Sequence, residues 1–128
     1  SAAKSWSISG DGLEITFQLR QDIYFHSQNG FHPTRPLNAD DVIFTFDRMR
    51  KSDHPLHRSS GGNYQYFNSL EMNKIIKDIV RIDNYKVKFV LDRPEAPILA
   101  NLAMDFASLI SKEYYEYLKE QKKVDQFD

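Results

Sequence analysis

Histidine has the most versatile chemistry in this chain, because it can serve as an acid, a base or a metal ligand. The four histidines are His26, His32, His54 and His57. His54 and His57 lie three residues apart, but they flank Pro55, which indicates a loop rather than a helix face. A metal site needs three or four ligands held by organised partners. We therefore expect no metal site and interpret these histidines as exposed loop residues.

Other residue types also fail to form a catalytic pattern. Asp40 and Asp41 are adjacent, and neighbouring helix positions do not face each other, so capping explains them better than acid–base chemistry. Residues 59–63 contain glycine but lack the lysine of a phosphate-binding loop. No serine lies in a nucleophile-elbow motif. The absence of cysteine excludes a thiol nucleophile, disulfides and cysteine zinc sites within these residues. We expect no catalytic residue, no metal, no cofactor and no enzymatic activity.

Composition narrows the remaining classes of protein. The 128 residues suggest one domain, spanning residues 1–128. The 17 basic and 18 acidic residues nearly balance, which argues against a nucleic-acid binder. No run of 18 apolar residues is present, so we expect no transmembrane helix. Aromatic residues make up 13% of the chain. They are expected to form either a core with tyrosines at its edge or a ligand-stacking surface.

The clearest structural signal is a helix from about residue 39 to residue 50. Asn38 is expected to be its N-cap, and Asp40 and Asp41 would lie in the first turn, where carboxylates suit the helix dipole. We place Asp47 on the exposed face. The apolar face is formed by Val42, Phe46 and Met49, and the basic end by Arg48, Arg50 and Lys51.

Two antiparallel hairpins are predicted from alternating apolar and polar residues. The first joins a short strand around Trp6 and Ile8 to a strand over residues 13–19, through a turn at residues 10–12. The second joins residues 79–82 to residues 86–91, through Asp83 and Asn84. A brief extended piece is expected at residues 24–26, and residues 27–37 and 52–63 are expected to be loops.

Three further helices complete the prediction. One is short and covers residues 69–77; another begins at Pro97, with Ile98, Leu102 and Ala103 as its apolar stripe. Ser111 is expected to cap the last helix, which presents Tyr114, Tyr117 and Leu118 on one side, with Glu113 in its first turn. The tail, residues 119–128, is expected to fray. The fold class is α+β: a mostly antiparallel sheet of about four strands with helices packed on one face.

Several segments together resemble a known family. They are Ser5–Gly12 (SWSISGDG), Thr16–Arg20 (TFQLR), Phe25-His26 and the Asn38–Arg48 segment (NADDVIFTFDR). The order and spacing are similar to those of the extracellular solute-binding proteins, family 5, which serve dipeptide, oligopeptide and nickel ABC importers. The resemblance implies a role in peptide capture for an ABC transporter.

A narrower likeness points to the dipeptide-binding branch, which includes haem-binding proteins and is close to the antimicrobial-peptide-binding Sap proteins. It rests on residues 33–35, 60–64 and 66–67, and on residues 93–97 and 102–108. Dipeptide, longer peptide, haem and cationic antimicrobial peptide therefore remain alternative ligands. A free-standing interaction or enzymatic domain is the alternative from another class.

The length of the chain departs from the family, whose members are about four times larger and close two lobes on their ligand. The resemblance therefore implies that residues 1–128 are a subdomain of the first lobe of a two-lobed periplasmic binding protein. It implies ligand-binding residues mostly outside this chain, a periplasmic or lipid-anchored location for the whole protein, and a transporter permease as partner. We expect the chain alone to be a monomer that binds no peptide tightly.

Overall fold

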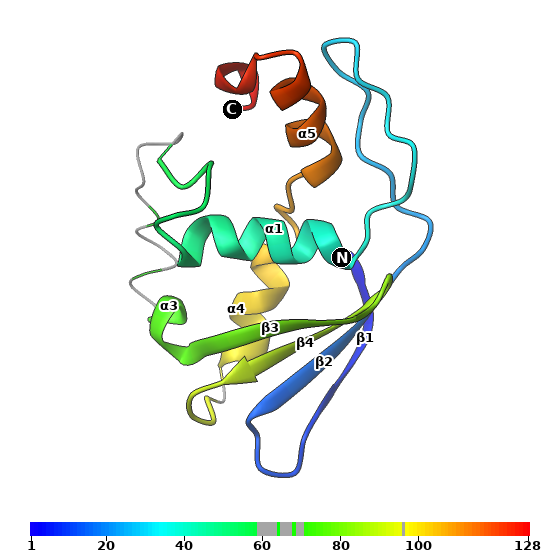
Figure 1. The fold of residues 1–128 in the computed structure, drawn as a ribbon. Helices are drawn as coiled ribbons and strands as arrows, with labels where there is room; N and C mark the ends of the chain where they lie inside the picture. The colour runs from blue at the N-terminus through cyan, green and yellow to red at the C-terminus, as the bar shows by residue number, and fades with distance from the viewer. Residues whose placement is uncertain (59–63, 65–67, 69–70, 96) are drawn as a thin grey trace.

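The computed structural model describes residues 1–58, 64, 68, 71–95 and 97–128. Its centre is a four-stranded antiparallel sheet in the order β1-β2-β4-β3, with helices packed against it (Figure 1). The strands are β1 (Ala3–Ile8), β2 (Glu14–Leu19), β3 (Ile76–Asp83) and β4 (Lys86–Leu91). The α+β class and the antiparallel sheet predicted from the sequence are confirmed.

The first hairpin forms where the alternation predicts it. Trp6 pairs with Phe17 and Ile8 with Ile15 across β1 and β2. The turn is closed by Asp11, whose carboxylate accepts hydrogen bonds from the Ser9 hydroxyl (2.6 Å) and the backbone N–H of residue 13 (3.0 Å). Every second residue of β2 is buried, so one face of this strand lies in the core.

The second hairpin is longer than predicted. β3 begins at Ile76, so the helix expected over residues 69–77 is reduced to α3 (Met72–Ile75), with residues 69–70 outside the described part of the chain. The turn follows Asp83, whose carboxylate accepts a hydrogen bond from the N–H of Tyr85 at 2.8 Å. Residues 24–26, expected to be a brief extended piece, are not part of the sheet.

Helix α1 (Ala39–Arg50) has the predicted bounds. The side chain of Asn38 accepts a hydrogen bond from the N–H of Asp40 at 2.9 Å, and Asp41 accepts one from the N–H of Asn38 at 3.0 Å. These two bonds form a reciprocal capping box, in which side chains satisfy backbone donors that the first helical turn leaves without partners.

The exposed face assigned to Asp47 is wrong. Only 18% of its side chain is exposed, and its carboxylate lies 2.9 Å from Arg50 and 3.5 Å from Lys51. The residue therefore belongs to a small group of charges at the end of α1.

The C-terminal third contains α4 (Ile98–Asp105), α5 (Lys112–Glu120) and a 3-10 turn, η1 (Val124–Gln126). Ser111 caps α5 as predicted, accepting from the N–H of Tyr114 at 3.0 Å. One detail of the predicted stripes is wrong, because Ala103 is exposed. Tyr114, Tyr117 and Leu118 lie in one cluster as predicted, and Tyr115 is also buried, in a second cluster.

The expectation that the tail frays is also wrong. Phe127 packs on Tyr114 and Tyr115, with ring centroids 5.5 and 6.3 Å apart. The carboxylate of Asp128 forms an ion pair with Arg48 at 2.7 Å. Two anchoring residues at the end of a polar segment thus fold it back onto α5 and α1.

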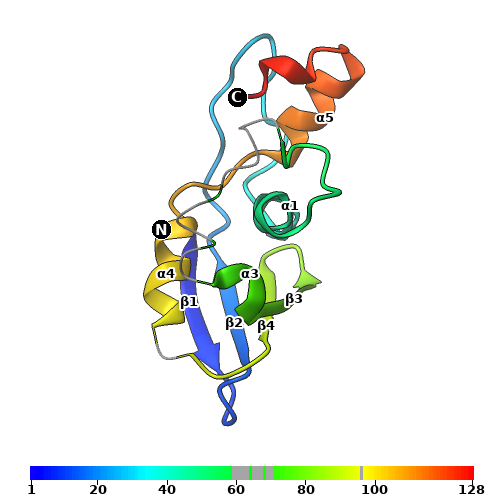
Figure 2. The same ribbon diagram turned by 90° about the vertical axis from the view of Figure 1, so that its left-hand side faces the viewer.

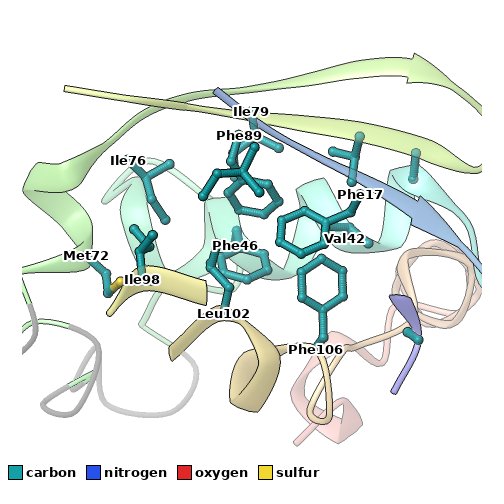
Figure 3. Close-up of a cluster of buried hydrophobic side chains, with 14 of the residues drawn as sticks. Phe17, Val42, Phe46, Met72, Ile76, Ile79, Phe89, Ile98, Leu102 and Phe106 are labelled. Atoms are coloured by element: carbon teal, nitrogen blue, oxygen red, sulfur yellow. The ribbon is translucent and has the colours of Figure 1, made fainter. Parts of the chain in front are cut away.

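The main core lies between the sheet, α1 and α4 (Figure 3). Four phenylalanines meet there: Phe17 contacts Phe89 and Phe106 at 5.5 and 4.8 Å between ring centroids, and Phe46 contacts Phe89 at 5.0 Å. Smaller clusters surround α5, on the opposite side of α1 from the sheet (Figures 1 and 2). Helix α1 therefore serves both cores, which explains why its apolar surface is wider than one stripe.

Candidate functional site

Asp41 is the centre of the most organised polar cluster in the described residues. Its side chain is fully buried and accepts hydrogen bonds from Arg35 at 2.7 Å, from the N–H of Asn38 at 3.0 Å and from the N–H of Lys112 at 2.9 Å. It therefore joins the loop before α1 to the start of α5. Capping alone, as the sequence suggested, does not explain this residue.

The charged groups of this cluster are held in structural pairs and are not placed to react. Burial opposes the charge on Arg35, but its hydrogen bond and charge interaction with Asp41 raise the pKa of the guanidinium above its ordinary value. Arg35 therefore stays charged and paired at any physiological pH. Adjacent Asp40 points elsewhere and forms an exposed ion pair with Arg81 at 3.1 Å. The two carboxylates thus act separately, as predicted from their adjacency.

Arg48 is the centre of a second polar cluster. The sequence predicts this residue at the basic end of α1, and the structure adds that it is only 8% exposed. Its Nε donates to the carbonyl of Leu56 and the hydroxyl of Tyr64, both at 3.1 Å, and its Nη2 donates to both carboxylate oxygens of Asp128, at 2.9 and 2.7 Å. The guanidinium therefore ties α1 to the following turn and to the C-terminal segment.

An open depression of about 210 Å³ adjoins this cluster. Its lining includes Arg48, Tyr64 and Asp128 together with Thr45 and Met49. Because the carboxylate of Asp128 already binds the guanidinium, the depression is occupied at its charged end by the chain itself. The arrangement is therefore suited to holding the fold together.

His54 and His57 are half-buried, so the interpretation of both as exposed loop residues is wrong. The Nδ1 of His54 accepts a hydrogen bond from the N–H of Leu56 at 3.1 Å, and the ring packs against Phe44, with centroids 4.6 Å apart. Burial lowers the pKa of His54. The Nδ1 of His57 lies 2.6 Å from the carbonyl oxygen of Arg48 and donates to it, because a carbonyl only accepts.

His32 lies apart from them in an exposed loop. Its Nδ1 is 3.0 Å from the hydroxyl of Ser27. A nucleophilic serine needs a base that a third group orients, and no such group contacts His32 among the described residues. The described part of the chain also holds no group of three His, Cys, Asp or Glu side chains placed to bind a metal ion.

Of Tyr64, Tyr66 and Phe67, the aromatic residues of one loop and a candidate ligand-stacking surface, the structure describes Tyr64. Its hydroxyl donates to the carbonyl of His57 at 2.7 Å, and its ring packs against the main core. Tyr66 and Phe67 lie outside the described residues. The described aromatic residue of this loop therefore packs within the fold.

In the described ranges, no helix combines the length and the apolar composition needed to cross a bilayer.

The polar clusters do not show to which family the chain belongs, but comparison with known proteins does. Residues 1–127 match the family described as bacterial extracellular solute-binding proteins, family 5 Middle. The chain belongs to this family. The resemblance carried by the SWSISGDG and NADDVIFTFDR segments is thereby confirmed.

Individual relatives fall in the branch that the narrower likeness indicated. The chain is 50% identical over 112 residues to a dipeptide-binding protein of Escherichia coli, covering 88% of this chain and 21% of that protein. It is 40% identical over 126 residues to haem-binding protein A of Haemophilus influenzae, covering 98% of this chain and 23% of that protein.

A solved structure agrees with the sequence relatives. The dipeptide-binding protein of Pseudoalteromonas sp. SM9913 in complex with Met-Leu superposes with a TM-score of 0.91 at 44% identity, covering all of this chain and 25% of that one. The chain thus spans between a fifth and a quarter of the length of the relatives it matches.

Proposed function

We propose that these 128 residues are a subdomain of the first lobe of a substrate-binding protein that captures dipeptides or related peptides for an ABC importer. The match of residues 1–127 to the solute-binding family, together with 50% identity to a dipeptide-binding protein, carries this proposal. The whole protein would work in the periplasm, or anchored by lipid at the outer face of a membrane, and would deliver its ligand to a transporter permease.

Within such a protein this subdomain would support the binding cleft rather than form it. The Asp41 and Arg48 clusters join α1, α5 and the intervening loops through buried hydrogen bonds. Buried charged networks that are fully paired make a fold rigid and specific. Rigid support favours binding because a preorganised wall loses less entropy when the ligand arrives.

The ligand-binding residues would lie mostly in the rest of the protein. Small ligands gain most of their binding free energy by being enclosed, typically over about 70–90% of their surface. A cleft closed by two lobes shares that enclosure between them, so one subdomain alone would leave a dipeptide largely in water. We infer that the isolated chain is a monomer without tight peptide affinity.

Haem is the second candidate ligand, because the chain is 40% identical to haem-binding protein A over 98% of its length. The higher identity to a dipeptide-binding protein favours peptide. An enzymatic role would require a reactive group, and the titratable residues described above are engaged in structural pairs. We infer a binding role without catalysis.

Isothermal titration of the longer protein with Met-Leu and, separately, with haemin would test the proposal. We expect saturable one-to-one binding of Met-Leu, and no binding of either ligand by the 128-residue chain. Binding of haemin with no binding of Met-Leu would favour the second candidate. Tight binding of either ligand by the 128-residue chain would show that it carries a complete site and would contradict the supporting role. Intact mass measurement of the native protein would separately test the alternative of a free-standing domain.

A further inference from the structure

One face of the sheet packs against helices, and at β1 this face extends past the area that the helices cover. Residues paired directly across an antiparallel ladder point to the same face, and Trp6 is paired with Phe17 and Ile8 with Ile15. Phe17 and Ile15 are 3% and 1% exposed, whereas Trp6 and Ile8 are 57% and 50% exposed. The core face of β1 is therefore apolar but uncovered.

Helix α4 lies beside β1, and no other described element covers its outer side (Figure 2). Its sequence, ILANLAMD, contains no charged residue before Asp105. Ile98 and Leu102 are buried against the core, while Ala100 and Ala103 are exposed and Leu99 is half-buried. Asn101, the one polar residue of α4 before Asp105, is half-buried. A surface helix normally presents a polar face to water, whereas the exposed positions 100 and 103 of this helix are alanines.

Trp6 of β1 and Leu99 and Ala103 of α4 line one apolar crevice, together with Phe17 and Phe106. The crevice itself is small, about 30 Å³. Ser1 also lines it, and Ser1 lines a larger groove of about 500 Å³ that includes Ile23, Phe25 and Leu37. Ser1 also borders a polar depression lined by Lys4, Arg20 and Asp22. The N-terminal residue therefore lies at the edge of the apolar surface, beside α4 in Figure 2.

We propose that the β1–α4 face, defined as Trp6, Ile8, Leu99 and Ala103, is covered by the polypeptide that immediately precedes Ser1 in the longer protein. This inference depends on the proposed function, in which these residues are part of a protein about four times as long. Ser1 itself lines the crevice with Trp6, Leu99 and Ala103, so a segment joined to it begins at the edge of this face. Its side chains toward α4 should be apolar, because the face offers apolar area and few polar partners.

A covalently attached segment also fits better than a second copy of the chain. Attachment at Ser1 holds the segment near its site at high effective concentration, so a small apolar contact suffices. A second copy would have to place its own surface over the same groove while avoiding the chain that leaves it. The edge position of β1 adds free backbone groups with which an extended segment can pair.

Cysteine accessibility would test this directly, because the 128 residues contain no cysteine. Ile8→Cys and Ala103→Cys place a thiol on the face, and Ile82→Cys, at a position that is 48% exposed on β3, is the matched control. Each variant is made in the 128-residue chain, in that chain extended by the segment preceding Ser1, and in the full protein. Maleimide modification at the named position is followed by peptide mass mapping, and circular dichroism confirms folding.

We expect modification at positions 8 and 103 to slow by about tenfold or more in both longer forms, and modification at position 82 to stay unchanged. Equal rates at positions 8 and 103 in all three forms would overturn the proposal. So would protection in the full protein without protection in the extended chain, because another region would then be the cover. Protection that depends on protein concentration would identify a second copy instead, and equal slowing at position 82 would show general shielding.

Trp6, the single tryptophan of the chain, gives a measurement that needs no variant on the face. Its emission should move to shorter wavelength when the preceding segment is added, with any tryptophan in that segment replaced by phenylalanine. An unchanged emission would contradict the proposal. Titration of the same full protein with Met-Leu separates the two hypotheses: binding without protection rejects the covered face alone, and protection without binding rejects the peptide-binding function alone.

Discussion

Helices α4 and α5 are similar in length but present opposite surfaces. The outer side of α5 carries charged residues, with Lys112 and Glu116 placed 4.0 Å apart as an i,i+4 pair. The outer side of α4 carries alanines and leucine. A surface helix normally has one apolar stripe and one polar face. Helix α5 meets that description, and its outer side is suited to contact with water. The outer side of α4 is apolar, which agrees with the proposed cover over the β1–α4 face.

The two helices are also held differently. Helix α5 is anchored by polar contacts: its first N–H donates to Asp41, and the hydroxyl of Tyr114 accepts from Asn29 at 2.7 Å. Helix α4 is anchored by the burial of Ile98 and Leu102 and by the contact of the following Phe106 with Phe17. Directional hydrogen bonds fix the position of α5. The buried contacts of α4 lie on one side of the helix, so its other side is available for packing.

The largest effect is expected from removing the anchor of α5. Asp41→Ala should lower the free energy of unfolding by about 3–5 kcal/mol, because it leaves the Arg35 charge and two backbone donors without their buried acceptor. Asp40→Ala is the matched control and should cost less than about 1 kcal/mol, because its ion pair with Arg81 is exposed. Urea denaturation midpoints measure both. Similar losses would mean that the cluster contributes no more than a surface ion pair.

Removal of the apolar anchor of α4 should have a comparable or slightly smaller effect. Leu102 is 0% exposed, so Leu102→Ala should cost about 2–5 kcal/mol through lost burial and the resulting cavity. The neighbouring Ala103→Ser, at an exposed position, should change the stability of the 128-residue chain by less than about 0.5 kcal/mol. A large loss at residue 103 would show that the outer side of α4 is already packed, and the contrast with α5 would fail.

Helix caps come next in size. Ser111→Ala and Asn38→Ala each remove a side-chain acceptor for a first-turn N–H and should cost about 0.5–2 kcal/mol. Glu116→Ala on the exposed side of α5 serves as control and should cost less than about 1 kcal/mol, because its side chain is 61% exposed. A negligible loss for Ser111→Ala would indicate that the bond to Asp41 alone fixes the start of α5.

The parts of the fold that the sequence predicted well depend on local rules. The bounds of α1, the Asn38 cap and the alternation of β2 follow from capping and from period-two patterning, which are visible within a few residues. The docked tail, by contrast, depends on the pairing of Arg48 with Asp128, 80 residues apart in sequence. A window of neighbouring residues contains no sign of that partner, so the tail was predicted to fray.

The polar clusters were missed for the same reason. Asp41 was assigned a capping role, which it has, but its bonds to Arg35 and to the start of α5 arise only when the two helices pack. The half-burial of His54 likewise follows from its contact with Phe44. Residues 98–104 contain no charged side chain, a pattern that predicts a helix with little polar surface.

A further effect is expected at Asp105, the one charged residue of α4, and it appears as a dependence on pH. Partial burial raises the pKa of Asp105 to about 6, from an ordinary value of 3.8. A group whose pKa is raised in the folded state binds more protons there than in the unfolded chain. Its contribution to stability is therefore fully present below pH 3.8 and is lost as the pH rises through about 6.

Asp105→Asn isolates this contribution, because an amide does not titrate in this range. The variant minus wild-type difference in melting temperature should rise from pH 4 toward pH 7, where the wild type carries the ionised, partly buried carboxylate. Other carboxylates contribute equally to both proteins and cancel in the difference. A difference that is flat across this range would mean that water reaches Asp105 freely, and that the region around α4 is less enclosed than α5.

In the N-terminally extended chain the rise should shift to higher pH, since a cover over α4 would desolvate the carboxylate further.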